Sequence, residues 1–551
     1  MNAANPTADQ APAIPAPAAA PTPPAEPTAP NAPSGPPAAY SPLKGTALLL
    51  GTLSLSLATF MNVLDSSIAN VSIPAIAGDL GVSPGQGTWV ITSFGVANAI
   101  SVPLTGWLTQ RFGAVRLFTM SVLLFVLTSW LCGFASSLEM LVFFRVLQGL
   151  VAGPMIPLSQ TLLLASYPKA LAGTALALWG VTTLVAPVVG PLLGGWITDN
   201  ISWPWIFYIN VPVGLLAGAL TWGIYRKRET PIRKLPIDTV GLSLLVLWVG
   251  ALQLMLDKGK ELDWFASGEI ITMAVVAVVA FAVFLVWELT DKHPVVDLKL
   301  FKGRNFTFGA LALSVAYALF FGNVVLLPLW LQQWMGYTAT SAGMALAPVG
   351  IFAILLTPLV GKKVGQWDPR RMATGAFIVF GAVLWMRSQF TVQTDFIHIL
   401  IPTLLQGAAM AFFFIPLTTL TLSGIAPERI PAAAGLSNFV RITAGAMGTS
   451  IATTLWESRA AMHHAHLTEG LVQGQGVFAQ TLDTLTATGL TQLQALAQVN
   501  RLIDQQAFTR AANDIFLGSA GLFLLLIGLI WLTKRPAKTT GAGAADAAGA
   551  H

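Results

Sequence analysis

Residues 48–76 read LLLGTLSLSLATFMNVLDSSIANVSIPAI, and Asp65 is the one charged residue among them. A helix crosses the hydrocarbon core of a bilayer with about 20 mostly apolar residues. The stretch is longer than that, so it predicts a membrane-spanning helix that carries a carboxylate. Ionisable groups at membrane depth are costly, and their presence indicates a functional site by default.

The rest of the chain repeats this apolar pattern. Of its 551 residues, 54% are hydrophobic and 10% are charged, whereas a soluble domain has about a quarter of its residues charged. Apolar runs begin near Leu48, Gly87, Leu117, Leu138, Ala170, Trp205, Val240, Ile270, Phe306, Ser341, Ala373, His398, Ala432 and Phe516. They predict an all-α integral membrane protein with fourteen transmembrane helices and both termini on one side.

Basic residues indicate the orientation of these helices, because short cytoplasmic loops carry an excess of Lys and Arg. Alternate loops carry Arg111, Arg116, Lys169, Arg226, Lys227, Arg228, Arg233, Lys234, Lys292, Lys299, Lys302, Arg304, Lys362, Lys363, Arg370, Arg371 and Arg429. In an intervening loop, Lys258 and Lys260 are offset by Asp257, Glu261 and Asp263. We therefore expect cytoplasmic termini. Since the basic residues form no single patch, no nucleic-acid partner is expected.

Three segments lie outside the apolar runs. Residues 1–44 are rich in Pro and Ala and poor in charge, which predicts a disordered tail, and 534–551 form a second tail. Residues from about 459 to 513 are polar and fall on the outer side. Stretches such as Gln492 to Gln506 indicate helix, so we expect an external cap or docking surface; the alternative is a flexible connector.

Polar residues in the first run share one helix face. Asn62, Asp65, Ser66 and Asn70 follow one another at spacings of three and four, apart from the adjacent pair, which is typical of one side of an α-helix. That face must point into the protein or into a water-filled cavity. Asp65 is either a carboxylate that takes up and releases a proton or a structural residue hydrogen-bonded to a neighbouring helix.

The fourth run contains a second ionisable residue. Arg145 and Gln148 face nearly the same way as Gly149 and Gly153, which are spaced to let another helix approach closely. A buried Arg needs a partner, either a carboxylate or carbonyls and water. Beside an acid it would favour the ionised form and so control protonation.

In the fifth run, APVVGPLLGG places Pro187, Gly190, Pro191, Gly194 and Gly195 within less than three turns. Proline removes backbone hydrogen bonds and glycine removes packing bulk, so this helix is expected to be bent and tightly packed. It is either a moving part or an ordinary close contact.

Amide, arginine and aromatic residues of other runs are candidates for a substrate cavity, since ligand pockets are mostly apolar with a few polar groups. The predicted cavity residues are Asn62, Asn70, Gln148, Tyr317, Phe320, Phe413, Asn438 and Arg441. Aromatic side chains also face lipid, which is the alternative for each of them. His463, His464 and His466 lie close in sequence but lack a fourth ligand, so no metal site is expected.

These motifs resemble a known family. Residues Leu64 to Pro74 are similar to the first-helix signature of the fourteen-helix drug:proton antiporters of the major facilitator superfamily. Arg145 with Gln148 and Gly149 resembles that superfamily's fourth-helix motif, and Gly190 to Gly195 its fifth-helix antiporter motif. Gly106, Arg111, Gly113 and Arg116 resemble its cytoplasmic motif between helices two and three, although Gln110 stands where the family has an acid. Pieces beginning at Ser56, Asp257 and Pro416 are similar to the EmrB branch, and the similarity runs from about Gly45 to Lys534.

The resemblance implies two six-helix bundles, at 45–225 and 306–533, with two helices inserted at 226–305. It also implies proton-driven efflux of hydrophobic drugs across the inner membrane of a Gram-negative cell, with no cofactor besides the proton gradient. The expected partners are an EmrA-type periplasmic adaptor and a TolC-type outer-membrane channel. Asp65 would carry the proton and Arg145 would control its protonation.

Other functions fit the sequence less well. A channel needs a continuous polar lining, whereas the polar residues here lie at isolated points. An enzyme needs a catalytic constellation, which the runs lack, and no phosphate-binding loop of the P-loop type occurs. Among transporters, the alternatives are an exporter of one metabolite or fatty acid and a symporter.

Overall fold

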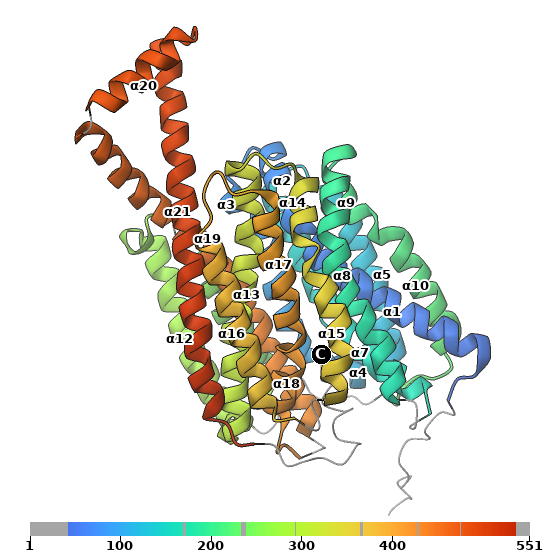
Figure 1. The fold of residues 1–551 in the computed structure, drawn as a ribbon. Coiled ribbons are helices and arrows are strands. Elements are labelled where there is room, and N and C mark those ends of the chain that lie inside the picture. The colour runs from blue at the N-terminus through green and yellow to red at the C-terminus, as the bar shows by residue number, and fades with distance from the viewer. Residues whose placement is uncertain are drawn as a thin grey trace, which may run out of the picture. The chain divides into compact units, whose positions relative to one another are not determined.

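The computed structural model describes residues 42–168, 172–232, 238–259, 261–291, 294–363, 367–426, 429–473 and 475–535, and these contain helices but no strand (Figure 1). The all-α prediction is confirmed for this part of the chain. Most of the two predicted tails, and the loop residues Lys169, Arg233, Lys234, Lys260 and Lys292, lie outside the described residues.

Each predicted run coincides with a helix or with a helix broken into consecutive pieces. The elements are α1 (Gly45–Ile68), η1 (Ala69–Val71), α2 (Ile73–Asp79), α3 (Pro84–Gly87), α4 (Trp89–Phe112), α5 (Ala114–Gly133), α6 (Leu138–Ala152), α7 (Met155–Ser166), α8 (Ala172–Asn200), α9 (Trp205–Tyr208), α10 (Asn210–Tyr225), α11 (Thr239–Lys258), η3 (Trp264–Ala266), α12 (Gly268–Thr290), η4 (Leu298–Lys302), α13 (Arg304–Trp334), α14 (Ala339–Leu346), α15 (Val349–Lys363), α16 (Pro369–Arg387), α17 (Phe396–Ala411), α18 (Phe414–Leu422), α19 (Ile430–Gln473), α20 (Gln475–Ala487) and α21 (Gln492–Trp531).

Eleven helical stretches of the described chain are long and apolar enough to cross a membrane. The remaining three predicted runs are occupied by α8, α16 and α19. Prolines mark two of the breaks inside a run: Pro154 stands between α6 and α7, and Pro348 stands between α14 and α15. Proline lacks an N–H donor and interrupts the helical hydrogen-bond ladder, which explains why one apolar run yields two helices.

Apolar side chains join helices that are distant in sequence. In one cluster, Phe118 of α5, Leu158 of α7 and Ala217 of α10 pack together. In another, α13, α16, α17 and α21 contribute to a core rich in aromatic rings, and Phe380 stacks on Phe523 with ring centroids 4.8 Å apart. Such interdigitated packing fixes the helices that hold the polar site described below.

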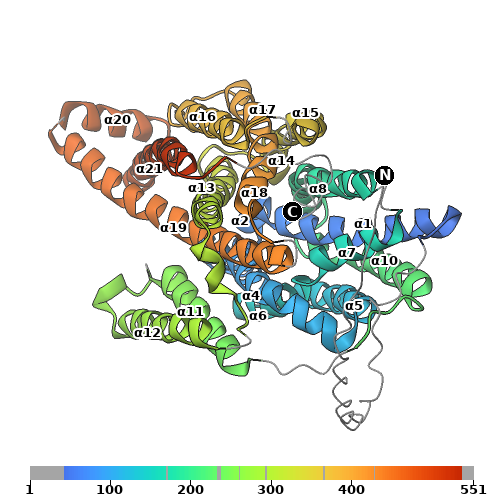
Figure 2. The ribbon, with the colours of Figure 1, turned by 90° about the horizontal axis from the view of Figure 1, so that it is seen from below.

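Helices α11 and α12 lie side by side, and α11 lies next to α4 and α19, as Figure 2 shows from below. Val249 of α11 and Phe284 of α12 pack with Val96 of α4 and Phe439 of α19. The inserted pair therefore contacts helices from both predicted bundles. The boundaries 45–225, 226–305 and 306–533 themselves stay predictions.

The segment predicted as a long loop is helical. The helix expected at Gln492 to Gln506 is confirmed as the first part of α21. α19 has 44 residues, which makes it about 66 Å long at the α-helical rise, and it runs with α20 and α21 beyond the other helices at the upper left of Figure 1. Trp456 donates to the carbonyl of Phe508 at 2.9 Å, which ties α19 to α21.

Candidate functional site

Asp65 and Arg145 form a buried ion pair. Arg145 Nη1 lies 2.5 Å from Asp65 Oδ2, and the two side chains are 1% and 0% exposed. Of the two kinds of partner expected for Arg145, the structure contains a carboxylate, which comes from α1, and also a backbone carbonyl, that of Val90. A buried pair is stable only when its remaining hydrogen-bonding groups are also satisfied.

Amide side chains supply those hydrogen bonds. Asp65 Oδ1 accepts from Gln148 Nε2 at 3.1 Å and from Asn210 Nδ2 at 2.9 Å. Arg145 donates through Nη1 to Gln148 Oε1 at 2.8 Å and through Nε to the Val90 carbonyl at 2.9 Å. Residues of α1, α6 and α10 thus meet at the Asp65 carboxylate, and the hydrogen bond from Arg145 to Val90 joins α4 to them.

Aromatic rings enclose the guanidinium. Its carbon lies 4.3 Å from the centroid of the Phe94 ring and 5.5 Å from that of Phe207. A cation above an aromatic face is attracted by the ring quadrupole, and the effect is larger away from water. The rings also keep the local dielectric low, which strengthens the attraction between Asp65 and Arg145.

The other polar residues of the first run, Asn62, Ser66 and Asn70, differ in burial and in hydrogen bonding. Asn62 is buried and donates to the carbonyl of Ala152 at 3.3 Å, whereas Ser66 is partly buried and donates to the carbonyl of Asn62. Asn70 falls in η1, beyond the end of α1, and its Oδ1 is buried with no hydrogen-bond partner among the described residues. The shared face therefore points into the protein at Asn62 and Asp65.

Glycines of α8 permit two close helix contacts. A Cβ on Gly194 would lie 2.5 Å from the carbonyl oxygen of Ile68 in α1, and one on Gly195 would overlap the carbonyl oxygen of Ala339 in α14. Gly190 faces Ser67, and Pro191 is buried, while the side chain of Pro187 lies outside the described residues. These contacts account for the small residues as close packing; their role as a moving part stays a prediction.

The turn between α4 and α5 contacts an acid that was not predicted from the sequence. Gly113 ends α4 with φ 87°, a conformation that favours glycine, while Gly106 and Arg111 lie on exposed faces. Glu229, which follows α10, accepts from the backbone N–H groups of Val115 and Arg116, both at 2.9 Å. A carboxylate at the start of α5 is stabilised by the helix dipole.

Predicted cavity residues of the second half fall into two environments. Arg441 of α19 lies over Tyr317 of α13, with its guanidinium carbon 4.9 Å from the ring centroid. Phe320 and Phe413 are buried among other rings of the core, and Asn438 is partly buried. The structure thus brings Tyr317 and Arg441 together, whereas Phe413 packs as a core residue with no exposed surface. That these residues bind substrate stays a prediction.

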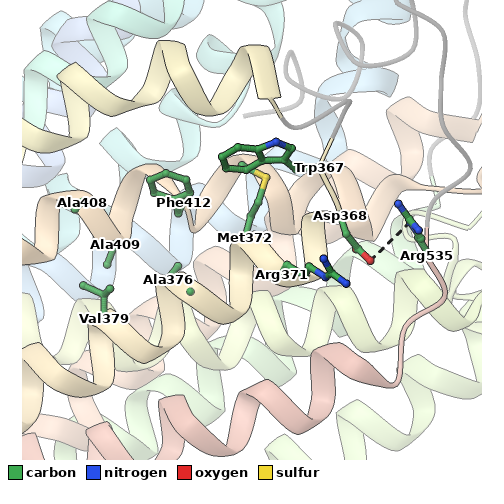
Figure 3. Close-up of a pocket in the computed structure, with 11 residues that line it drawn as sticks. Trp367, Asp368, Arg371, Met372, Ala376, Val379, Ala408, Ala409, Phe412 and Arg535 are labelled. Carbon is green, nitrogen blue, oxygen red and sulfur yellow. Dashed lines mark ion pairs between the residues drawn. The ribbon is translucent and has the colours of Figure 1, made fainter.

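Two cavities are lined by other residues. Figure 3 shows a cavity of about 700 Å³ between α16 and α17, where Met372, Ala376 and Phe412 form an apolar wall. Its mouth carries Asp368, whose Oδ2 lies 3.8 Å from Arg535 Nε. Hydrogen bonds from Arg370 hold the pKa of Asp368 below its usual range. A smaller cavity of about 230 Å³ lies among α1, α8 and α10, beside Asn210.

Three functional candidates were absent from the sequence prediction. Asn210, an amide at the start of an apolar helix, could have been noticed for that reason. Glu229 gave no comparable signal because it lies in a charged loop. Asp257 was assigned to a loop, and this was wrong: it lies in the last turn of α11 and accepts hydrogen bonds from two other helices.

Several known proteins are similar to this chain in sequence. The sequence model of the Major Facilitator Superfamily matches residues 55–449. The chain is 54% identical over 514 residues to the multidrug export protein EmrB of Escherichia coli (strain K12), covering 92% of this chain and 99% of that protein. It is 50% identical over 501 residues to the fatty acid resistance protein FarB of Neisseria gonorrhoeae, covering 91% and 99%.

A solved structure is similar in fold. The crystal structure of an auto-inhibited POT family peptide transporter aligns with a TM-score of 0.60 over 90% of this chain and 98% of that one, at 15% sequence identity. At this identity the likeness concerns the fold alone.

Proposed function

The chain belongs to the major facilitator superfamily, as a multi-span membrane transporter, and from that premise we propose that it exports hydrophobic drugs and other toxic compounds across the bacterial inner membrane in exchange for protons. The drug-export part rests on similarity over almost the whole chain to multidrug export proteins. The proton-coupling part rests on one observation, the buried pair of Asp65 and Arg145.

The proposed coupling follows from the chemistry of that pair. An ionised carboxylate only accepts hydrogen bonds, whereas a protonated one also donates. Protonation of Asp65 would remove its attraction to Arg145 and leave the guanidinium with Gln148 and the Val90 carbonyl. The contact between α1 and α6 would weaken, and the helices could rearrange between inward- and outward-open states.

The driving force is sufficient. Each proton that moves inward down the membrane potential releases about 2.3 kcal/mol per 100 mV. A tenfold concentration ratio of drug costs about 1.4 kcal/mol. One proton per drug therefore supports export against a gradient when the two movements are tightly coupled.

We propose that the protein is the inner-membrane component of a three-part efflux system. An EmrA-type periplasmic adaptor and a TolC-type outer-membrane channel would receive the drug. The extension formed by α19, α20 and α21 would lie on the periplasmic side, with the termini in the cytoplasm, and would dock the adaptor.

The test is dye efflux from proteoliposomes under an imposed pH gradient. Asp65→Asn is expected to abolish gradient-driven efflux while dye binding persists, and Glu139→Gln, an exposed acid on α6, is expected to leave efflux unchanged. Efflux by Asp65→Asn that still follows the gradient would make Asp65 a structural residue.

Export of fatty acids is the second candidate, because the similarity to FarB is nearly as high as that to EmrB. Laurate added to the same liposomes discriminates the two. Strong competition by laurate at low concentration would favour a fatty-acid exporter, and co-movement of protons and substrate would indicate a symporter.

A further inference from the structure

A second carboxylate joins three helices away from the Asp65 site. Asp257 Oδ2 accepts from Thr92 Oγ1 of α4 at 3.0 Å. Its Oδ1 accepts from Gln253 Nε2, one turn earlier in α11, at 2.9 Å and from Ser450 Oγ of α19. Asp257 is separated from Thr92 by 165 residues and from Ser450 by 193. One side chain of an inserted helix thus connects helices of both predicted bundles.

The groups that hold Asp257 are buried more deeply than the carboxylate. Thr92, Gln253 and Ser450 are 0%, 4% and 2% exposed, whereas Asp257 itself is only partly buried. The carboxylate therefore lies in a polar, pre-formed environment, and the residue that carries it is partly exposed.

Gln253 provides an unused acceptor. Its Nε2 also donates to Ser450 Oγ at 2.6 Å, but its Oε1 is buried with no hydrogen-bond partner among the described residues. A buried amide oxygen without a donor costs about 1–3 kcal/mol. A protonated carboxyl could supply the missing donor after the amide turns about its last bond. The cluster satisfies the ionised Asp257 and is also built to satisfy the protonated one.

We propose that Asp257 is a second proton-binding site, distinct from Asp65, whose protonation loosens the contact among α4, α11 and α19. In the ionised state the carboxylate holds Thr92 and Ser450 together by charge-assisted hydrogen bonds. Such bonds are roughly twice as strong as neutral ones. Proton uptake weakens them and so reduces the attraction between the two bundles at this point.

The neighbouring charges favour a proton as the ligand. Lys258, the cation next to Asp257 on α11, is paired with an acid of α12, because its Nζ lies 3.8 Å from Glu269 Oε1. Glu261, beyond the end of α11, adds negative charge near Asp257. On α19 the nearest acid in sequence is Glu457, two turns after Ser450, and α4 contributes no charged residue before Arg111 at its far end. The surplus of acids stabilises a bound proton. A sodium ion needs several oxygen ligands, whereas Thr92, Gln253 and Ser450 already donate to the carboxylate and leave Gln253 Oε1 as the unpaired oxygen of the cluster within the described chain.

The test is pH-difference infrared spectroscopy of the full-length protein in liposomes, which detects the C=O stretch of a protonated carboxyl. The Asp65→Asn variant is the background, so the result does not depend on the proposed role of Asp65. Between about pH 5 and pH 8, this variant is expected to show a carboxyl band that Asp65→Asn/Asp257→Asn lacks. Glu269→Gln on the same background, the removal of an exposed acid, should retain the band.

Further variants keep the test independent of folding defects. Gln253→Leu leaves the carboxylate but removes the Nε2 donor that stabilises its ionised form, so the band should shift in frequency and appear at higher pH. Asp257→Glu should restore a band at a changed position. Identical spectra with and without Asp257 would overturn the proposal, and so would a band that sodium chloride, compared with potassium chloride at constant pH, removes.

Discussion

Replacing Arg145 by methionine would leave a carboxylate unpaired in the interior. Methionine fills a similar volume and carries no charge. The substitution removes the 2.5 Å contact with Asp65, the 2.9 Å hydrogen bond to Val90 and the cation–π contact with Phe94. Arg145 makes three hydrogen bonds, to Asp65, Gln148 and Val90. A hydrogen bond of a charged group contributes about 1.5–3 kcal/mol, and breaking a buried pair from one side costs about 3–5 kcal/mol.

We therefore expect Arg145→Met to lower the free energy of unfolding in detergent by about 4 kcal/mol. Asp65→Asn in the same chain removes the unpaired charge, so the double variant should be more stable than the sum of the two single effects by about 2 kcal/mol. Reversible unfolding by denaturing detergent, followed by circular dichroism, measures all four proteins. Arg111→Met, at the exposed end of α4, should change stability by less than about 0.5 kcal/mol.

Additive effects in this cycle would refute the reasoning. They would mean that Asp65 and Arg145 do not stabilise each other, although the structure places them in contact. A loss below about 1 kcal/mol for Arg145→Met would mean that water reaches the pair, because exposed ion pairs contribute little.

Three further predictions follow from local geometry. Gly113→Ala should cost about 1–3 kcal/mol, because φ is 87° there and the new Cβ would displace Glu229; thermal unfolding measures the loss, and Gly106→Ala, in open space, is the control. Gly195→Val should force α8 away from the Ala339 carbonyl and cost about 1–3 kcal/mol of overpacking; cysteine cross-linking between α8 and α14 should decline, while unchanged cross-linking would contradict the close contact. The pKa of Asp368 is lowered in the folded protein. Its contribution to stability is therefore full above the pKa of about 3.9 that it has in the unfolded chain, and it is lost as the pH falls through the lower pKa of the folded state. Asp368→Asn should remove this loss of stability in acid, and a variant that loses stability in acid like the wild type would contradict the prediction.

The helices could be predicted because the bilayer restricts the choice. Backbone groups in lipid must be hydrogen-bonded within their own segment, so apolar runs of sufficient length become helices. What could not be predicted is where an element breaks or continues. The polar stretch after about residue 459 resembled a loop by composition, yet α19 continues through it, because contacts such as Trp456 with Phe508 stabilise the extension.

The polar site was predictable only in part. Asp65 and Arg145 attracted attention as ionisable residues in apolar runs, and pairing followed because an unpaired charge is too costly there. Asn210 completes the site from 145 residues away. No periodicity connects α1 with α10, so its contact with Asp65 depends on how the bundle packs and is invisible in sequence alone.

Gln110 illustrates the limit of reasoning by motif. Where the family has an acid, this chain has an amide, which placed the charge interactions of the loop in doubt. Glu229, which follows α10, places a carboxylate at the turn between α4 and α5, and its Oε2 lies 3.9 Å from Arg116 Nε. The physical requirement is negative charge at the start of α5, and a residue from a different loop can meet that requirement.

Asp257 shows the opposite error. Asp257 stands beside Lys258, Lys260 and Glu261 and was therefore assigned to a charged loop. A cluster of charged residues in sequence does not show which of them faces another helix. In the structure its side chain, in the last turn of α11, accepts a hydrogen bond from Thr92 of α4. A carboxylate at a helix end can therefore face the solvent or a neighbouring helix. At Asp257 the hydroxyl groups of Thr92 and Ser450 on the facing helices hold it at a helix contact.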